Sequence, residues 1–190
     1  MFNQSLNLFA NEEQRKKWLP EALQYNIHGC YVQTEIGHGS DVSRLETTAT
    51  FDKEKDEFVI DTPTISATKW WPGELGRWSN YAVLFARLII EEDGEKNDYG
   101  IAPFLVQLRC RDTHKYMPGI EAGDLGPKLG YAGKDNGWLT LNKVRVPRSQ
   151  LLQKFLEVDR DGSVSIQGDM RALYATMMMI RVTLVNFAKT

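Results

Sequence analysis

Short apolar runs separated by polar segments fill the middle of the chain. They are rich in β-branched, aromatic and aliphatic side chains, which favour strands. The runs are residues 29–34, 45–52, 58–60, 81–90, 101–108, 138–141 and 144–146. The charged segment 52–57 predicts a turn between two strands, and the polar segment 93–98 predicts a surface turn. Since no helix separates the strands, the pattern favours an antiparallel sheet that curls into a barrel or a sandwich.

The two ends of the chain follow a helical pattern instead. Asn11 and Gln14 have the spacing of a capping box at the start of one helix, and Pro20 interrupts the run that follows. Residues 171–188 predict a second, largely apolar helix, because side chains recur there close to the helical period. Those positions are Leu173, Thr176, Met177, Ile180, Leu184 and Phe187.

A helix this apolar needs partners, and residues 1–28 supply too little cover for it. We therefore expect the chain to be part of a larger α-β-α protein. Residues 1–28 would end an N-terminal helical domain, residues 29–158 would form a β-domain, and residues 159–190 would begin a C-terminal helical domain. The expected fold is thus mainly β, an antiparallel barrel or sandwich flanked by helical segments at both ends.

Composition narrows the function classes. The 190 residues are 42% hydrophobic and 25% charged, with a formal net charge of −2, which is ordinary for a globular protein. The chain lacks the excess of basic residues that is typical of nucleic-acid binding. It also has no apolar run long enough to span a membrane. The spacing of Cys30 and Cys110 suits neither a zinc site nor a redox pair, and the histidines lack metal-ligand spacing. We expect no metal site.

One candidate for chemistry is the segment TEIGHGSD at residues 34–41, where a predicted strand opens into a loop. Its hydroxyl groups offer short donors, and its glycines let a ligand approach the backbone. The alternative is a tight turn held by the side chains of Ser40 and Asp41.

A second candidate is KWWPG at residues 69–73. Adjacent residues of a strand point to opposite faces, so one tryptophan would lie in the core while the other covers a planar ligand. The backbone amide of Gly73 could then approach a ring. The alternative is an ordinary aromatic core followed by a Pro-Gly turn.

Together these segments resemble the acyl-CoA oxidases, the peroxisomal branch of the acyl-CoA dehydrogenase and oxidase superfamily. The similar segments are GCYVQTEIGHGS at 29–40, LETTATFD at 45–52, KWWPG at 69–73, GDLGPKLG at 123–130, DNG at 135–137 and RVPR at 145–148. Acyl-CoA dehydrogenases usually carry tryptophan, isoleucine and then threonine or serine in place of KWWPG, so this segment favours the oxidase branch. Two departures are Glu74, where relatives often have a second glycine, and Asp41, which is closer to the dehydrogenase pattern.

The resemblance implies FAD as cofactor and assigns residues to it. The Thr34 hydroxyl would contact the flavin near N5, and the Gly73 amide would donate to the same region. Either Trp70 or Trp71 would pack beside the ring; we assign Trp71. The resemblance also implies that three further residues shape the floor of the pocket: Gln33, Gly39 and Ser40. Glu35 and Asp41 are expected to be structural.

The implied reaction introduces a 2,3-trans double bond into a fatty acyl-CoA and reduces O2 to hydrogen peroxide. In the family the catalytic base is a glutamate of the C-terminal helical domain, and no glutamate of this chain matches it, so we assign no catalytic residue. The resemblance further implies a homodimer and a peroxisomal location. The alternatives are an acyl-CoA dehydrogenase with a protein electron acceptor, and a non-catalytic β-barrel that binds partners without flavin.

Overall fold

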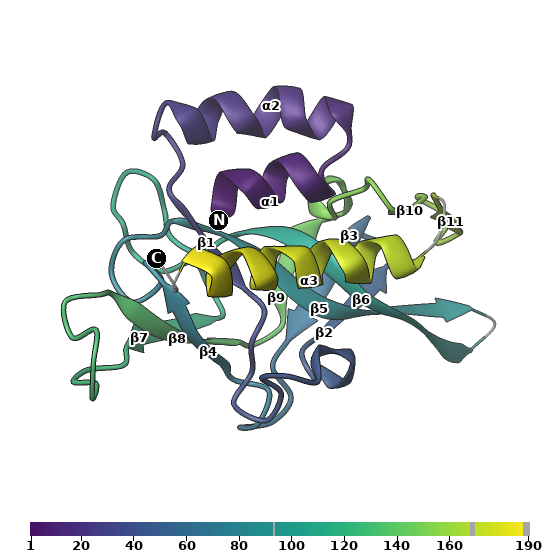
Figure 1. Ribbon diagram of the computed structural model, residues 1–190. Helices are drawn as coiled ribbons and strands as arrows, with labels where there is room; N and C mark the ends of the chain where they lie inside the picture. Colours follow the sequence, from purple (N-terminus) through teal and green to yellow (C-terminus); the bar gives the residue numbers. More distant parts are fainter. Residues whose placement is uncertain (93, 168–169, 188–190) are drawn as a thin grey trace.

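The computed structural model describes residues 1–92, 94–167 and 170–187. Its helices are α1 (Phe2–Phe9), α2 (Glu12–Leu23) and α3 (Met170–Phe187). Its strands are β1 (Gly29–Val32), β2 (Thr48–Asp52), β3 (Glu57–Asp61), β4 (Lys69–Gly73), β5 (Tyr81–Glu92), β6 (Glu95–Gln107), β7 (Ile120–Asp124), β8 (Asn136–Leu141), β9 (Val144–Pro147), β10 (Leu156–Val158) and β11 (Val164–Ile166). The strands curl into a half-open barrel with helices from both ends of the chain beside it, so the expected mainly β class is confirmed (Figure 1).

Strand β5 is the centre of the main sheet. Its first half pairs with β1 and its second half with β2, both in parallel, while β6 pairs with it in antiparallel. Strands β3 and β9 extend the sheet beyond β2 by antiparallel pairing. The sheet is therefore mixed, where the sequence predicts a purely antiparallel one. The reason is that the chain crosses over through β4 before it forms β5, and a crossover is what a parallel pair requires.

Side chains of β5 alternate between two apolar cores. Leu84 and Leu88 face the core between the main sheet and the small sheet of β4, β8 and β7. Val83 and Phe85 face the core that the helices cover. A strand that is buried on both faces needs no polar alternation, which explains the near-continuous apolar run at residues 81–90.

The N-terminal helices are only partly as expected. The capping box is confirmed, because the Asn11 side chain accepts from the Gln14 N–H at 2.9 Å and the Gln14 side chain accepts from the Asn11 N–H at 3.1 Å. The expectation that Pro20 interrupts the helix is wrong, since α2 continues through it to Leu23. Proline removes a single backbone donor close to the end of α2, and Gln24 still donates to the Pro20 carbonyl at 3.0 Å.

Helix α3 confirms the C-terminal helical pattern. Leu173, Met177 and Ile180 are buried in the same core as the N-terminal helices and the outer face of β5. The side chains of Leu184 and Phe187, and residue 188 altogether, lie outside the described part of the chain. Among the described helices, none is long and apolar enough to cross a membrane.

The hairpin of β5 and β6 is longer than the sequence indicates. Asp98 lies opposite Ile89 and Glu95 lies opposite Glu92, so the expected surface turn is wrong for residues 95–98. Residue 93 lies outside the described residues. The polar side chains of this arm are largely exposed, so backbone pairing decides the structure and β propensity does not.

Candidate functional site

The loop after β1 lies against β4 and the residues that lead into it. The backbone N–H of Trp70 donates to the Thr34 carbonyl at 2.9 Å, and the N–H of Ile36 donates to the Thr68 carbonyl at 3.0 Å. These bonds join two segments that are far apart in sequence. The two segments that the sequence singles out are therefore neighbours in the fold.

Thr34 and Gly73 both belong to this contact region. Thr34 is half-buried beside Trp70, and Gly73 is the last residue of the same strand, β4. A Cβ at Gly73 would lie 3.1 Å from Cε of Lys134, so this flexible side chain would have to move by a few tenths of an ångström. The structure thus brings the two residues to one region of the molecule, and their contact with a cofactor stays a prediction.

Both tryptophans of β4 are exposed, Trp70 by 39% and Trp71 by 54%. The expectation that one of them lies in the core is wrong. Trp71 has a left-handed backbone with φ of 62°, and the register with β8 shifts between Trp70 and Gly73. This irregularity interrupts the alternation of a regular strand, and Pro72 is buried instead. Two indoles are consequently left at the surface, and the backbone N–H of one of these residues, Trp70, is bonded to Thr34.

Gln33 contains an unused hydrogen-bond donor. Its side chain is 3% exposed, and its Oε1 accepts from the Tyr31 hydroxyl at 3.1 Å. Its Nε2 has no partner among the described residues. Leaving a buried N–H unpaired costs about 1–3 kcal/mol, so a ligand with an acceptor at this point would remove that cost.

The glycines of the loop differ in their surroundings. A Cβ at Gly37 would lie 3.0 Å from Cβ of Ser66, so glycine is needed there for packing of the chain on itself. At Gly39 no described atom lies within 4 Å of such a Cβ. Gly39 and Ser40 are exposed, and their place at a pocket floor stays a prediction. Asp41 holds the following turn, since its carboxylate accepts from the Ser43 hydroxyl.

A buried ion pair lies directly under this region. The Nζ of Lys69 and Oε1 of Glu35 are 2.9 Å apart, and both side chains are fully buried. Glu35 is structural, as expected, because it also accepts from the N–H groups of Glu46 at 2.8 Å and Thr47 at 3.0 Å. Lys69 has no role among the sequence-based expectations. The hint in the sequence is that a lysine stands directly before the paired tryptophans while an acid, Glu35, stands beside Thr34 in the other segment.

The pKa values of the pair shift for different reasons. Burial alone would raise the pKa of Glu35, but the Lys69 charge and the hydrogen bonds from Glu46 and Thr47 outweigh it and hold that pKa below its ordinary value. Burial lowers the pKa of Lys69 to about 8, against the opposing effect of Glu35. For Glu35 the effect of Lys69 and the hydrogen bonds on the pKa is thus larger than the effect of burial. For Lys69 the effect of burial on the pKa is larger than that of Glu35. In buried ion pairs generally, desolvation of both charges offsets much of their attraction.

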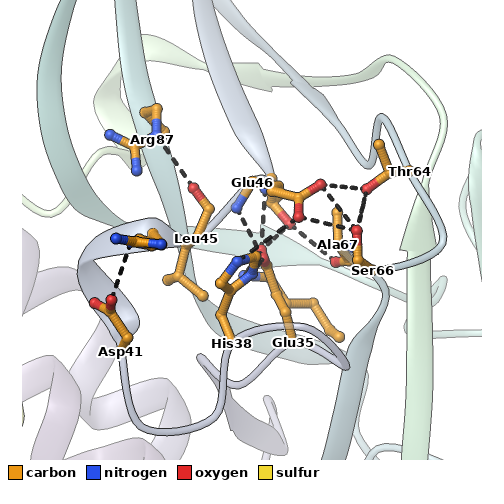
Figure 2. A network of polar contacts seen from close by, with 12 residues as sticks. Glu35, His38, Asp41, Leu45, Glu46, Thr64, Ser66, Ala67 and Arg87 are labelled. Atoms are coloured by element: carbon orange, nitrogen blue, oxygen red, sulfur yellow. Dashed lines mark hydrogen bonds and ion pairs between the residues drawn. The ribbon is translucent and has the colours of Figure 1, made fainter.

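From Glu35, polar contacts continue to His38 and Glu46 and on to Ser66 and Thr64 (Figure 2). His38 Nδ1 lies 3.2 Å from Oε2 of Glu35, and its Nε2 lies 3.7 Å from Oε1 of Glu46. Glu46 accepts from the hydroxyl groups of Ser66, at 2.9 Å, and Thr64. The network therefore fixes the loop of residues 35–38 to the segment that precedes β4.

Glu74, the departure noted in the sequence, has a left-handed backbone with φ of 67°. Its carboxylate pairs with the ammonium of Lys134, the side chain that also lies over Gly73. Glycine adopts this conformation without strain, which explains why a glycine suits this position.

We expect Glu74→Gly to be more stable than Glu74→Ala by about 1 kcal/mol. Both variants remove the pair with Lys134, so they differ in the strain of the left-handed backbone, which at positive φ outweighs the extra unfolded-chain entropy of glycine. Urea unfolding of the two variants checks this. Equal midpoints, or a more stable alanine variant, would contradict the strain at Glu74.

The described residues offer little other chemistry. No group of three or more histidine, cysteine, aspartate or glutamate side chains among them could hold a metal ion. Cys30 and Cys110 are free thiols. Burial raises the pKa of Cys30 to about 12, so this thiol stays protonated and unreactive. The region around Thr34 and β4 is suited to binding a planar ligand that carries hydrogen-bond acceptors. The donors would be hydroxyl and amide groups of the protein.

Known proteins similar to this chain are acyl-CoA oxidases. Residues 30–144 match the family model described as acyl-CoA dehydrogenase, middle domain. Over 189 residues the chain is 48% identical to peroxisomal acyl-coenzyme A oxidase 1 of Arabidopsis thaliana, covering 97% of this chain and 28% of that protein. The chain therefore spans little more than a quarter of the length of this relative.

Solved structures give the same result. The structure of Arabidopsis thaliana acyl-CoA oxidase 1 superposes with a TM-score of 0.88 at 48% identity, covering 97% of this chain and 28% of that one. Acyl-CoA oxidase-2 of Caenorhabditis elegans, bound with FAD, ascaroside-CoA and ATP, superposes with a TM-score of 0.89 at 45% identity, covering 95% and 27%. The similarity thus extends over nearly all of the chain, helices included.

Proposed function

Because this chain belongs to the acyl-CoA dehydrogenase family and matches its middle domain, we propose that it is the flavin-binding β-domain of a peroxisomal-type acyl-CoA oxidase. The whole enzyme binds FAD noncovalently, introduces a 2,3-trans double bond into a fatty acyl-CoA and passes the electrons to O2, which yields hydrogen peroxide. The relatives named as oxidases support this assignment, and one of them was solved with FAD and ascaroside-CoA.

The observation that carries the proposal is the hydrogen bond between the Trp70 N–H and the Thr34 carbonyl. It joins the hydroxyl-bearing loop to the strand that ends in Gly73. Two further features fit a flavin. The unpaired Nε2 of Gln33 is a buried donor that a ring carbonyl or ring nitrogen would satisfy, and the exposed indoles of β4 offer flat apolar surface.

The residues of this chain then bind and orient the cofactor. Bound FAD supplies the hydride acceptor of the reaction. The Thr34 hydroxyl and the Gly73 N–H hold the reactive edge of the ring, where fixed donors stabilise developing negative charge. Trp71 packs beside the ring, and Gln33 donates its amide. Gly39 and Ser40 line the floor of the pocket. We assign the base that removes the α-proton to a glutamate outside this chain.

Replacing Thr34 with alanine in the full-length protein is expected to weaken FAD binding or slow flavin reduction by acyl-CoA by about tenfold or more, because a positioned donor to the ring is lost. Thr34→Ser retains the hydroxyl and is the matched control. Flavin content after dialysis and single-turnover reduction measure the two effects. Wild-type flavin content together with a wild-type reduction rate in the alanine variant would overturn the assignment of Thr34.

The electron acceptor separates an oxidase from a dehydrogenase. We propose O2, because KWWPG stands at residues 69–73 and the similar proteins are named oxidases. Residues 1–28 then end the N-terminal helical domain, residues 29–158 form the flavin-binding domain, and residues 159–190 begin the C-terminal helical domain. We further propose that the full-length protein is a homodimer in the peroxisome.

A further inference from the structure

We propose that the buried pair of Glu35 and Lys69 positions Thr34 against β4, and so sets the distance between the two halves of the flavin site. Neither residue contacts the reacting atoms in this proposal; both act through the backbone beside them. The proposal rests on the proposed function, because it names the residues that hold that same site in shape. Three observations support the proposal. They are the contacts of the Lys69 ammonium, the contacts of the Glu35 carboxylate and the energetics of buried ion pairs.

All three donors of the Lys69 ammonium are used. Its Nζ donates to Oε1 of Glu35 at 2.9 Å, to the Gln33 carbonyl at 3.2 Å and to the Phe85 carbonyl at 2.7 Å. Two of these acceptors belong to the residues immediately before and after Thr34. The Lys69 ammonium therefore donates to groups of both neighbours of Thr34. Its third hydrogen bond connects Lys69 to the central strand β5.

The backbone next to Lys69 also holds Thr34 in place. The N–H of Trp70, the following residue, donates to the Thr34 carbonyl. Thr34 is thus held at its own carbonyl and on both sides by consecutive residues of β4. A shift of Thr34 along this strand would break the Trp70 bond and both contacts of Lys69 at once.

The carboxylate anchors the other end. Its Oε1 accepts from the Thr47 N–H at 3.0 Å and the Thr47 hydroxyl at 2.6 Å, and its Oε2 accepts from the Glu46 N–H at 2.8 Å. Residues 46 and 47 lead into β2, which pairs with β5. The pair consequently ties the loop of Thr34 to β2, β4 and β5 together, and its position is set by the sheet.

Stability alone does not account for such a pair. Replacing a buried ion pair by apolar side chains of similar size is often neutral or stabilising, because desolvation of both charges offsets their attraction. What an apolar pair could not supply is the directional contact with the Gln33 carbonyl just before Thr34, the Phe85 carbonyl on β5 and the N–H groups of Glu46 and Thr47. We therefore assign the pair to geometry, and the test must separate geometry from stability.

The test compares full-length wild-type protein with the double variant Glu35→Gln/Lys69→Met, which removes both charges and keeps similar side-chain volumes. Leu156→Ala in β10 is the control for lost stability, since Leu156 is buried but lies outside this network. The readouts are the FAD dissociation constant, the visible spectrum of bound flavin, and hydrogen exchange of the peptide that contains the Trp70 amide.

We expect the double variant to bind FAD about tenfold or more weakly, since small displacements of positioning groups have effects of this size. Its flavin band should shift and its Trp70 amide should exchange faster, whereas Leu156→Ala keeps the wild-type band. A folded double variant with the wild-type dissociation constant, spectrum and exchange would overturn the proposal.

Two further arms keep the proposal testable. If the double variant does not fold, Thr47→Val removes the 2.6 Å hydroxyl bond to Glu35, together with a longer 3.3 Å bond to the Ala67 carbonyl. It should weaken FAD binding, and Thr47→Ser should restore it. Equal binding by both variants would overturn the proposal. If wild-type protein binds no FAD, the proposed function fails instead, and exchange of the Trp70 amide in the flavin-free protein decides whether the pair holds Thr34.

Discussion

Lys69→Met is expected to lower the free energy of unfolding by about 3–5 kcal/mol, the cost of leaving a buried charge without its partner. Methionine fills a similar volume, but the Glu35 carboxylate then stays fully buried without the ammonium that lies 2.9 Å from it, and the basic group that remains beside it is the His38 ring. Urea unfolding at neutral pH measures the effect. The matched control is Lys16→Met on helix α2, where the lysine is exposed and its pair with Glu12 is at the surface, so the expected change is within about 0.5 kcal/mol.

The loss of stability in Lys69→Met should depend on pH in a defined direction. In the wild-type protein Glu35 has a lowered pKa, so its contribution is present above the unfolded-state pKa and is lost as the pH falls. Without Lys69, burial prevails and raises the folded-state pKa of Glu35 above its unfolded value. Protonation then favours the folded state, so the deficit of Lys69→Met should be smaller at pH 5 than at pH 8. A deficit that grows toward pH 5 would contradict the role of Glu35.

Phe85→Ala is the second large expected effect, a loss of about 3–5 kcal/mol in the free energy of unfolding. Phe85 is fully buried on β5, and its ring lies 5.4 Å from that of Phe9 in α1 and 5.1 Å from that of Tyr31 in β1. Alanine would leave a cavity where the N-terminal helix meets the central strand. The backbone carbonyl that accepts from Lys69 is retained, so the loss reports packing.

Thermal and urea unfolding check this prediction, with Ile65→Ala as the control. Ile65 is 85% exposed, and truncating it should change stability by less than about 0.5 kcal/mol. A Phe85→Ala loss no larger than that of the control would show that the helix core does not depend on this ring.

Local patterns predict much of this fold, and long-range pairing decides the rest. The capping box of Asn11 and the apolar run of β5 are visible in the sequence because each depends on residues that lie close together in it. The parallel pairing of β5 with β1 and β2 is not visible, since it depends on a crossover that strand composition does not encode. The polar arm at residues 95–98 is a strand because β5 continues opposite it.

The same division holds in the candidate site. The motifs containing Thr34 and Gly73 are recognisable from the sequence, and the structure confirms that their segments are neighbours. The exposure of both indoles is not predictable by alternation, because Trp71 has a left-handed backbone. The role of Lys69 is visible only in three dimensions, since its acceptors are the Gln33 carbonyl and the Glu35 carboxylate in the loop segment and the Phe85 carbonyl on β5, which the sequence does not link to Lys69.

The most direct test of the central claim is the flavin absorbance of the purified full-length protein, recorded first without O2 as a fatty acyl-CoA is added and then after O2 is admitted. An FAD-binding oxidase predicts a flavin band that bleaches with the substrate and returns rapidly with O2, with formation of hydrogen peroxide. A band that bleaches and returns only with a protein acceptor would identify a dehydrogenase. A colourless protein, with no flavin band after incubation with FAD, would contradict the account.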